Sequence, residues 1–269
     1  MSLYVNTNTS SINSQRQLAK STKALDSSYQ KLSSGFRINS AKDDAAGLQI
    51  SDRMTAQING LTQGNRNAND GISFAQTAEG ALDEVTNMLQ RMRTLTVQAQ
   101  NGTNSADEKT AINEEVHQLG AEINRIGSST KFGKQLAVFS GDSMTLQVGA
   151  YSGNTISFTA KDMDTVLGDT SYSAFDATLT TSISTLDGMI ASVDSYRAEL
   201  GAVQNRLESS ISNQENVIEN VSDARSRIRD VDYASETAKM TQQSILQQAS
   251  TSILSQANMK SQIALSLLG

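Results

Sequence analysis

The chain has 269 residues, a formal net charge of −6, no proline, no cysteine and one histidine. The absence of cysteine excludes disulfides, thiolate nucleophiles and cysteine zinc sites. The single histidine excludes HExxH proteases and metal sites that need several histidines. The acidic net charge argues against a general nucleic-acid binder. An apolar share of 37% with 4% aromatics is low for a globular core, and the absence of proline favours long uninterrupted helices, because an internal proline costs about 3 kcal/mol.

A heptad pattern marks the N-terminal stretch. Its positions follow one another at alternating steps of four and three residues: Leu18, Thr22, Leu25, Tyr29, Leu32 and Phe36. This spacing places a narrow seam along one face of a helix. The small residues at 33–35 favour a break, and residues 36–47 are irregular and rich in turn and cap formers. We therefore expect a terminal helix followed by a connector.

Two further helical patterns follow. The first has Asp70 as its expected N-cap and ends near Asn101-Gly102. Its apolar positions are Ile72, Ala75, Ala78, Leu82, Val85, Leu89, Met92, Leu95 and Ala99. The second opens with a capping box at residues 105–108 and ends before Gly127. Because about five polar residues separate them, the two helices should pack as an antiparallel hairpin.

The period of the apolar pattern then changes to two residues. Two alternating runs flank a glycine-rich turn: Met144, Leu146 and Val148, then Ile156, Phe158 and Ala160. This alternation predicts a β-hairpin within about residues 134–176. Residues 141–185 are rich in serine and threonine and are predicted to form a surface excursion.

Helical spacing returns in the last third of the chain. Apolar residues from Ile183 to Ile228 predict a helix of about 50 residues, or ~75 Å. A final amphipathic segment runs from Leu246 to Leu268. Since no compact domain of this size needs such a helix, the predicted fold is mainly α: a long antiparallel helical rod with coiled-coil terminal helices and a small β-hairpin. Narrow seams at both termini are typical of helices that find partners in another chain.

No stretch has the pattern of an active site. Residues 127–134 resemble a phosphate-binding loop, but five residues separate the glycines and Gln135 stands where the motif requires Ser or Thr. His117 has no nucleophile near it in the pattern, and the adjacent Asp43 and Asp44 do not share a helix face. No apolar run approaches the ~20 residues of a membrane span, and the N-terminus lacks the usual signal-peptide pattern. We expect no enzyme activity, cofactor, metal, nucleic-acid partner or membrane span.

Several segments strongly resemble bacterial flagellin. In the first half they are LSSGFRINSAKDDAAGLQI (residues 32–50), RNANDGISFAQTAEGAL (66–82) and LQRMR (89–93). In the second half they are LGAVQNR (200–206), ENVSDARSRI (219–228) and ILQQA (245–249). Together they carry a resemblance over roughly residues 1–150 and 177–269.

The resemblance implies a structural subunit that self-assembles into the flagellar filament for swimming motility. It implies an inner coiled-coil polymerisation domain (residues 1–42 and 229–269) and an outer helical rod domain (43–228), without the large outer domains of many flagellins. It also implies a secreted, extracellular protein whose partners are copies of itself, the flagellar export apparatus and export chaperone, the filament cap, hook-associated proteins and a host innate immune Toll-like receptor. A hook–filament junction protein is the alternative, because such proteins resemble flagellin at both termini.

Three sets of site residues follow. The heptad spacing predicts a polymerisation seam of Leu18, Leu25, Leu32, Leu246, Ile253 and Leu268. The resemblance implies receptor contacts at Arg91, Leu95 and Glu115, with Leu95 exposed if Thr96 takes the core position. It also implies O-glycosylation in the serine- and threonine-rich excursion, with the candidates Ser143, Thr155, Ser171 and Thr178.

Overall fold

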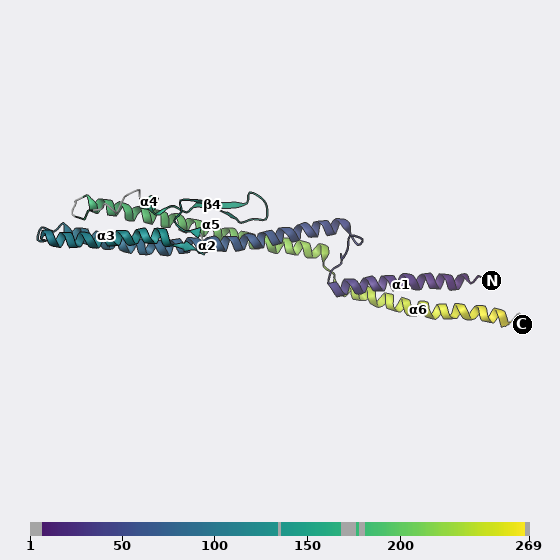
Figure 1. Cartoon of the computed structure of the whole chain (residues 1–269). Helices are drawn as coiled ribbons and strands as arrows, with labels where there is room; N and C mark the ends of the chain where they lie inside the picture. Colours follow the sequence, from purple (N-terminus) through teal and green to yellow (C-terminus); the bar gives the residue numbers. More distant parts are fainter. Residues whose placement is uncertain (1–6, 134–135, 168–175, 178–180, 267–269) are drawn as a thin grey trace. The chain divides into compact units, whose positions relative to one another are not determined.

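The computed structural model describes residues 7–133, 136–167, 176–177 and 181–266, with side chains described up to residue 259. Helices dominate this part of the chain and two small antiparallel sheets accompany them (Figure 1). The chain divides into unit 1, which comprises Met1–Ala56 and Asn220–Gly269, and unit 2, which comprises Gln57–Glu219. The predicted mainly α fold with antiparallel helices and a small hairpin is confirmed.

Unit 1 contains a pair of antiparallel helices. α1 (Thr9–Ser34) begins at the N-cap Asn8, whose side chain accepts a hydrogen bond from a backbone N–H of the first turn. It ends at Gly35, which has a left-handed φ of 76° and donates its N–H to the Lys31 carbonyl at 2.9 Å. Glycine adopts this conformation without steric cost, so the chain breaks where the sequence predicts. α6 (Tyr233–Ser266) runs beside α1 in the opposite direction (Figure 1).

Short backbone contacts align the two helices of this pair. Phe36 and Asp230 form an isolated antiparallel bridge. The Arg37 N–H donates to the Arg229 carbonyl at 2.7 Å. These bonds lie immediately after α1 and immediately before α6, so they determine where the two helices begin to run side by side.

α2 (Ala45–Ala99) is much longer than predicted, and Asp70 lies inside it. The expected N-cap role of Asp70 is therefore wrong. Buried positions in the first half of α2 include the small residues Ser51, Gly64 and Ala68. A search for apolar periodicity does not detect such positions, because they carry almost no apolar surface.

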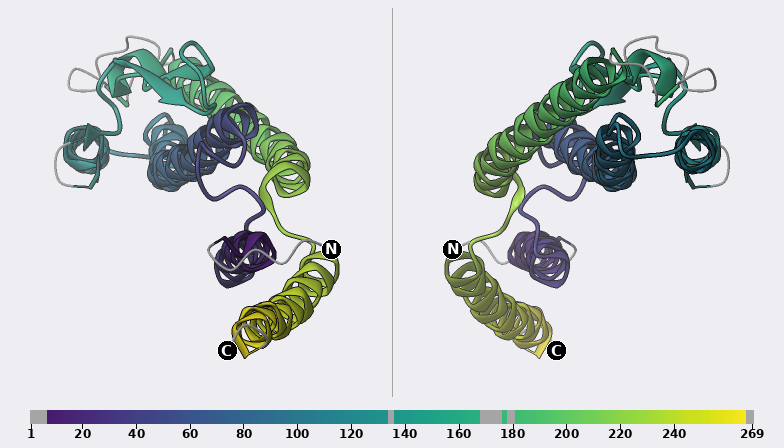
Figure 2. Two further views of the ribbon diagram at one scale, coloured as in Figure 1. Left: turned by 90° about the vertical axis from the view of Figure 1, so that its right-hand side faces the viewer. Right: turned by 90° about the vertical axis from the view of Figure 1, so that its left-hand side faces the viewer.

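Unit 2 is built on α3 (Ala106–Ser129) and the larger parts of α2 and α5 (Ser182–Arg229). α2 lies between the other two helices in the end-on views of Figure 2. The predicted capping box starts α3: the Ser105 and Glu108 side chains each accept a hydrogen bond from the other residue's backbone N–H. Aliphatic side chains from the three helices fill the core. Its fully buried members include Leu82, Val85, Leu89, Met92, Val116, Ile123, Leu186, Val193 and Leu200.

The predicted hairpin is also present. β3 (Ser143–Gln147) pairs with β4 (Thr155–Thr159) in antiparallel register. A second, smaller pair, β1 (Lys131–Phe132) with β2 (Leu136–Ala137), and the short helix α4 (Met163–Val166) are not predicted by the sequence. Elements of two to four residues are too short to show a period.

Small residues on α2 make room for the hairpin. Gly64, Ala68 and Gly71 lie at steps of four and three residues and therefore share one helix face. A Cβ at position 64 would collide with the Val148 carbonyl, and one at position 71 would collide with the Leu146 side chain. Glycine thus allows the backbone of the hairpin to approach α2 more closely than any other residue would.

Candidate assembly surface

α1 and α6 contact each other through a largely polar seam, whose positions follow at steps of three and four residues on both helices. On α1 the buried and half-buried positions of this series are Ser11, Ser14, Leu18, Ser21, Leu25, Ser28 and Leu32. On α6 they are Glu236, Met240, Gln243, Gln247, Ser250, Leu254 and Ala257. We call these residues the pairing seam.

Hydrogen bonds join the two helices at both ends of the pairing seam. Near the start of α1, Asn8 Nδ2 donates to the Ala257 carbonyl and Ser11 Oγ donates to the Asn258 side chain, each at 2.9 Å. At the other end, Ser28 donates to Glu236, as described below. Such bonds contribute about 0.5–1.5 kcal/mol each once competition with water is counted. Because eight of its fourteen positions are polar, the pairing seam buries little apolar surface and holds the pair only weakly.

Further large apolar side chains of the pair lie outside this seam and are exposed. They are Ile12 and Tyr29 on α1 and Tyr233, Ile245, Leu246, Ile253 and Met259 on α6, and each is at least 37% exposed. We call these the outer apolar residues. Exposed large apolar side chains gathered on one helical pair are typical of an interaction surface.

The predicted polymerisation seam divides between these two sets. Leu18, Leu25 and Leu32 belong to the pairing seam, Leu246 and Ile253 are outer apolar residues, and Leu268 lies outside the described residues. The line predicted through Tyr29 is displaced by one position, since Ser28 is buried and Tyr29 is 56% exposed. A serine fits between two closely packed helices where a tyrosine ring does not.

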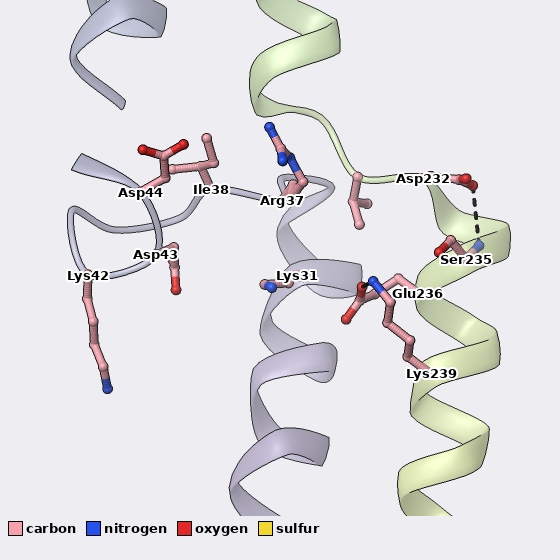
Figure 3. Close-up of a pocket in the computed structure, with 11 residues that line it drawn as sticks. Lys31, Arg37, Ile38, Lys42, Asp43, Asp44, Asp232, Ser235, Glu236 and Lys239 are labelled. Carbon is pink, nitrogen blue, oxygen red and sulfur yellow. Dashed lines mark hydrogen bonds and ion pairs between the residues drawn. The ribbon is translucent and has the colours of Figure 1, made fainter. Parts of the chain in front are cut away.

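A hollow of about 660 Å³ lies beside one end of the pair (Figure 3). Cationic and anionic side chains line it in equal number: Lys31, Arg37, Lys42 and Lys239, with Asp43, Asp44, Asp232 and Glu236. Because these charges balance, the hollow favours neither an anion nor a cation.

Three of these carboxylates hold the backbone in place. Asp43 accepts hydrogen bonds from the N–H groups of Ser40 and Asn39, and these bonds lower the pKa of Asp43. Asp44 accepts from a backbone N–H in the first turn of α2, and Asp232 does the same at the start of α6. Asp43 and Asp44 therefore act as turn and cap residues, as their positions in the sequence favour.

Glu236 is the fourth carboxylate and the only buried one among the described residues, at 6% exposure. Its Oε1 accepts a hydrogen bond from Ser28 Oγ at 2.7 Å. Lys239 Nζ lies 3.4 Å from Oε2, and Figure 3 shows these two side chains next to each other. The Ser28 hydrogen bond, helped by the positive charges of Lys239 and Lys31, lowers the pKa of Glu236. Sequence reasoning missed this residue because a charged side chain at a seam position adds nothing to an apolar pattern.

The predicted receptor-contact residues lie in unit 2. Arg91 on α2 and Glu115 on α3 form an ion pair at 2.7 Å, and about half of each side chain is exposed. Leu95 is only 2% exposed and Thr96 is fully buried. The expectation that Leu95 becomes exposed when Thr96 faces inward is therefore wrong. Because α2 packs between two helices, its buried face is wide enough to cover both positions.

Of the predicted glycosylation candidates, Ser143 and Thr155 are exposed at the first positions of β3 and β4. Ser171 and Thr178 lie outside the described residues. Exposed hydroxyls at strand ends are accessible to a modifying enzyme, and a bulky group there displaces no core side chain.

The other sequence features do not form a site. Gly127 lies within α3 against Met163, while Gly133 lies in the turn between β1 and β2, so the two glycines do not form one phosphate loop. His117 is half-buried and contacts Asn113 at 3.4 Å. In the described part of the chain, no group of three or more acidic or histidine side chains is placed to hold a metal ion. None of the described helices is both long and apolar enough to cross a bilayer.

Comparison with known proteins gives consistent matches over most of the chain. Residues 5–143 match the model of the bacterial flagellin N-terminal helical region, and residues 183–268 match that of the bacterial flagellin C-terminal helical region. A flagellin of Halalkalibacterium halodurans is 46% identical over 271 residues, which cover 99% of this chain and 100% of the relative. Flagellin D of Vibrio cholerae is 37% identical over 377 residues, which cover 100% of both chains.

Two solved structures are also similar. A Bacillus cereus flagellin has a TM-score of 0.49 and 31% identity, covering 55% of this chain and 88% of that one. A putative flagellar hook-associated protein from Vibrio parahaemolyticus has a TM-score of 0.60 and 15% identity, covering 70% of this chain and 100% of that one. At 15% identity the second match shows a common fold alone, so it does not favour the junction-protein alternative.

Proposed function

The chain belongs to the bacterial flagellin family, and on this basis we propose that it assembles through the outer apolar residues of the α1–α6 pair. It is a structural subunit of the bacterial flagellar filament, which serves swimming motility, and it is not an enzyme. The observation that carries the proposal is the distribution of side chains in the pair: eight of the fourteen pairing-seam positions are polar, while the outer apolar residues are exposed.

Neighbouring subunits would supply the stabilisation that the isolated pair lacks. Full burial of a leucine or isoleucine contributes about 1.5–3 kcal/mol, more than a hydrogen bond of the pairing seam. Leu246 and Ile253 are one heptad apart and therefore lie on the same face of α6. Ordering each residue of an isolated helix costs about 1–2 kcal/mol, so we expect the terminal helices to be less ordered in the free subunit than in the filament.

A double substitution tests this surface. Leu246→Gln with Ile253→Gln should raise the subunit concentration needed for seeded assembly by about tenfold or more, since each 1.4 kcal/mol of lost contact energy is a factor of ten. Thr251→Gln, also exposed on α6, is the matched control and should assemble as the wild type does. Electron microscopy and sedimentation measure the result. Normal assembly of the double variant would contradict the proposal.

Terminal deletions test the same proposal on a larger scale. Removing residues 1–30 or 240–269 should abolish assembly and leave unit 2 folded, because the core of unit 2 lies entirely between residues 57 and 219. Helix content measured by circular dichroism would show whether unit 2 is intact. Normal filaments from either deletion would refute the assignment of assembly to the termini.

We further propose that residues 1–42 and 229–269 form the inner layer of the filament and residues 43–228 its outer layer. Support comes from the concentration of outer apolar residues in the first two ranges. A density map of the assembled filament would test this directly. The expected result is that α1 and α6 lie nearest the filament axis.

The proposed partners beyond self-assembly are the export apparatus and its chaperone, the filament cap and hook-associated proteins, with the final location outside the cell. The absence of proline supports export in an unfolded form, because refolding then needs no X–Pro isomerisation, which takes tens of seconds. Detection of the chain in the medium of cells with intact flagella, and its loss when export is blocked, would test this. A hook–filament junction subunit would instead be present in a few copies at the filament base.

We also propose that the free subunit is recognised by an innate immune receptor through Arg91 and Glu115. Support comes from their exposure and from their proximity, since the ion pair presents both charges at one place between α2 and α3. The same surface would be covered by neighbouring subunits, so only released subunits should activate the receptor.

Modification is proposed for the exposed hydroxyls at Ser143 and Thr155. The unmodified chain has a mass of 28.8 kDa. An intact mass above this value for protein purified from its native source would support glycosylation, and the unmodified mass would refute it.

A further inference from the structure

The turn between α2 and α3 contains an Asn-Gly pair, Asn101-Gly102, in which both residues are exposed and lie outside the helices. The sequence has one other such pair, Asn59-Gly60, which lies inside α2. In an Asn-Gly pair the backbone nitrogen of the glycine approaches the asparagine side-chain amide with little steric hindrance, because glycine has no Cβ. The chain therefore contains the same reactive dipeptide in two different backbone settings.

The turn holds the Asn101 side chain against the backbone of the residues that follow it. Asn101 Oδ1 accepts a hydrogen bond from the Thr103 N–H at 3.3 Å, which draws the side-chain amide back along the Gly102 peptide unit. The same hydrogen bond polarises the side-chain carbonyl. Within the described part of the chain, the Gly102 N–H donates no hydrogen bond of its own. The nucleophilic nitrogen is thus not engaged elsewhere.

We propose that Asn101 is a site of spontaneous deamidation in the folded subunit. The Gly102 backbone nitrogen attacks Cγ of Asn101, and its proton is transferred to the departing amide. The new N–Cγ bond replaces the Cγ–Nδ2 bond, and ammonia leaves. Water then opens the five-membered imide at either carbonyl and yields aspartate or isoaspartate. The Thr103 N–H stabilises the oxyanion that forms on Oδ1 during the attack, and water is the only co-reactant.

The second pair is protected by its helix. Inside α2 the Gly60 N–H belongs to the ladder of hydrogen bonds along the helix, and helical dihedral angles hold it away from the Asn59 side chain. Gly60 also packs closely against Ala150 of the hairpin loop. Reaction at Asn59 therefore requires local opening of a helix interior, which is much rarer than motion of an exposed turn.

Each conversion adds one negative charge to a subunit whose net charge is −6. The new carboxylate lies close in sequence to Asp107 and Glu108 at the start of α3. Where isoaspartate forms, the turn also gains one methylene in its backbone. Since every subunit carries the same turn, the charge of a filament would become more negative with age. This inference depends only on the turn and does not rest on the proposed assembly surface.

Peptide mapping of the full-length chain tests the proposal. Cleavage after Arg and Lys releases residues 94–109, which contain Asn101, and residues 54–66, which contain Asn59. After incubation of the folded chain at mildly alkaline pH, residues 94–109 should acquire the mass change of an amide-to-acid conversion at least about tenfold faster than residues 54–66, a barrier difference of ~1.4 kcal/mol. Fragmentation should place the change at Asn101.

Two comparisons separate the effect of structure from that of sequence. In denaturant both Asn-Gly pairs should react at similar rates, because the helix around Asn59 is then lost. Gly102→Ala, in the folded chain, should slow the reaction of residues 94–109. Equal rates for the two peptides in the folded chain, reaction at Asn104 in place of Asn101, or an unaffected Gly102→Ala variant would each overturn the proposal.

Discussion

Replacement of Gly64 by alanine tests the close packing of the hairpin on α2. The added Cβ would point at the Val148 carbonyl, well inside van der Waals contact, and backbone atoms have no rotamer through which to yield. At Gly80, on the same helix, an added Cβ would meet no atom within 4 Å, so Gly80→Ala is the matched control. Both substitutions remove a helical glycine and differ only in what the new methyl group meets.

The two variants should differ in stability by about 1–3 kcal/mol, the usual cost of forcing an extra methyl group into a packed site. Alanine gains up to about 1 kcal/mol over glycine in a helix interior, and this gain applies to both variants. Gly80→Ala should therefore be more stable than the wild type by up to about 1 kcal/mol. Gly64→Ala should lose that gain, and at the upper end of the range it should be about 2 kcal/mol less stable than the wild type.

Thermal unfolding followed by circular dichroism measures the difference. For a unit of this size, 1 kcal/mol corresponds to about 2–4 °C in Tm. Gly80→Ala should melt at or above the wild-type temperature and Gly64→Ala below that of Gly80→Ala. If Gly64→Ala melts at the same temperature as Gly80→Ala, the hairpin does not pack on α2 as closely as the structure shows.

Three other expectations follow from the contacts described above. The Ser28 hydrogen bond lowers the pKa of Glu236 in the folded pair, so the carboxylate stabilises the pair at pH values above the ordinary pKa of glutamate. This stabilisation is lost as the pH falls through the lowered pKa. Glu236→Gln should remove that part of the acid dependence of helix content. Tyr196→Phe should destabilise unit 2 by about 1–3 kcal/mol in denaturant titrations, since the buried hydroxyl accepts from the Lys161 N–H and donates to a carbonyl of β4. Arg91→Ala should lower receptor activation by free subunits about tenfold in a cell reporter assay, while Arg125→Ala, an exposed arginine of the same unit, should not; equal activation by both would remove Arg91 from the receptor surface.

Long helices with apolar faces were predictable from the sequence, and helices with small-residue faces were not. α5 occupies Ser182–Arg229, close to the predicted run from Ile183 to Ile228, because its buried face is made of large aliphatic residues. The first half of α2 escaped prediction because its buried positions include serine, glycine and alanine. Hydrophobic periodicity detects buried apolar side chains, so it gives no signal at positions where small residues let two backbones pack closely.

The candidate assembly surface was predictable only in part for a related reason. The heptad pattern located both terminal helices, yet it could not distinguish the positions that face the partner helix from those that face outward. Ser28 and Tyr29 are neighbours in the sequence, and the larger, more apolar one lies outside. A single chain that pairs internally and also joins a polymer has two contact faces on one helix, and apolar residues occupy both, so the apolar pattern alone cannot tell one face from the other.

The repeat within α1 has a consequence for alignment. Serine is followed four residues later by leucine three times in succession, in Ser14–Leu18, Ser21–Leu25 and Ser28–Leu32. A shift of α1 along α6 by seven residues would move each serine of this repeat to the position of the next serine and each leucine to that of the next leucine. The repeat by itself therefore does not specify one alignment. The bridge between Phe36 and Asp230 specifies the alignment, because it pairs the residues just after α1 with those just before α6. The bridge therefore selects one alignment among those that the repeat alone would allow.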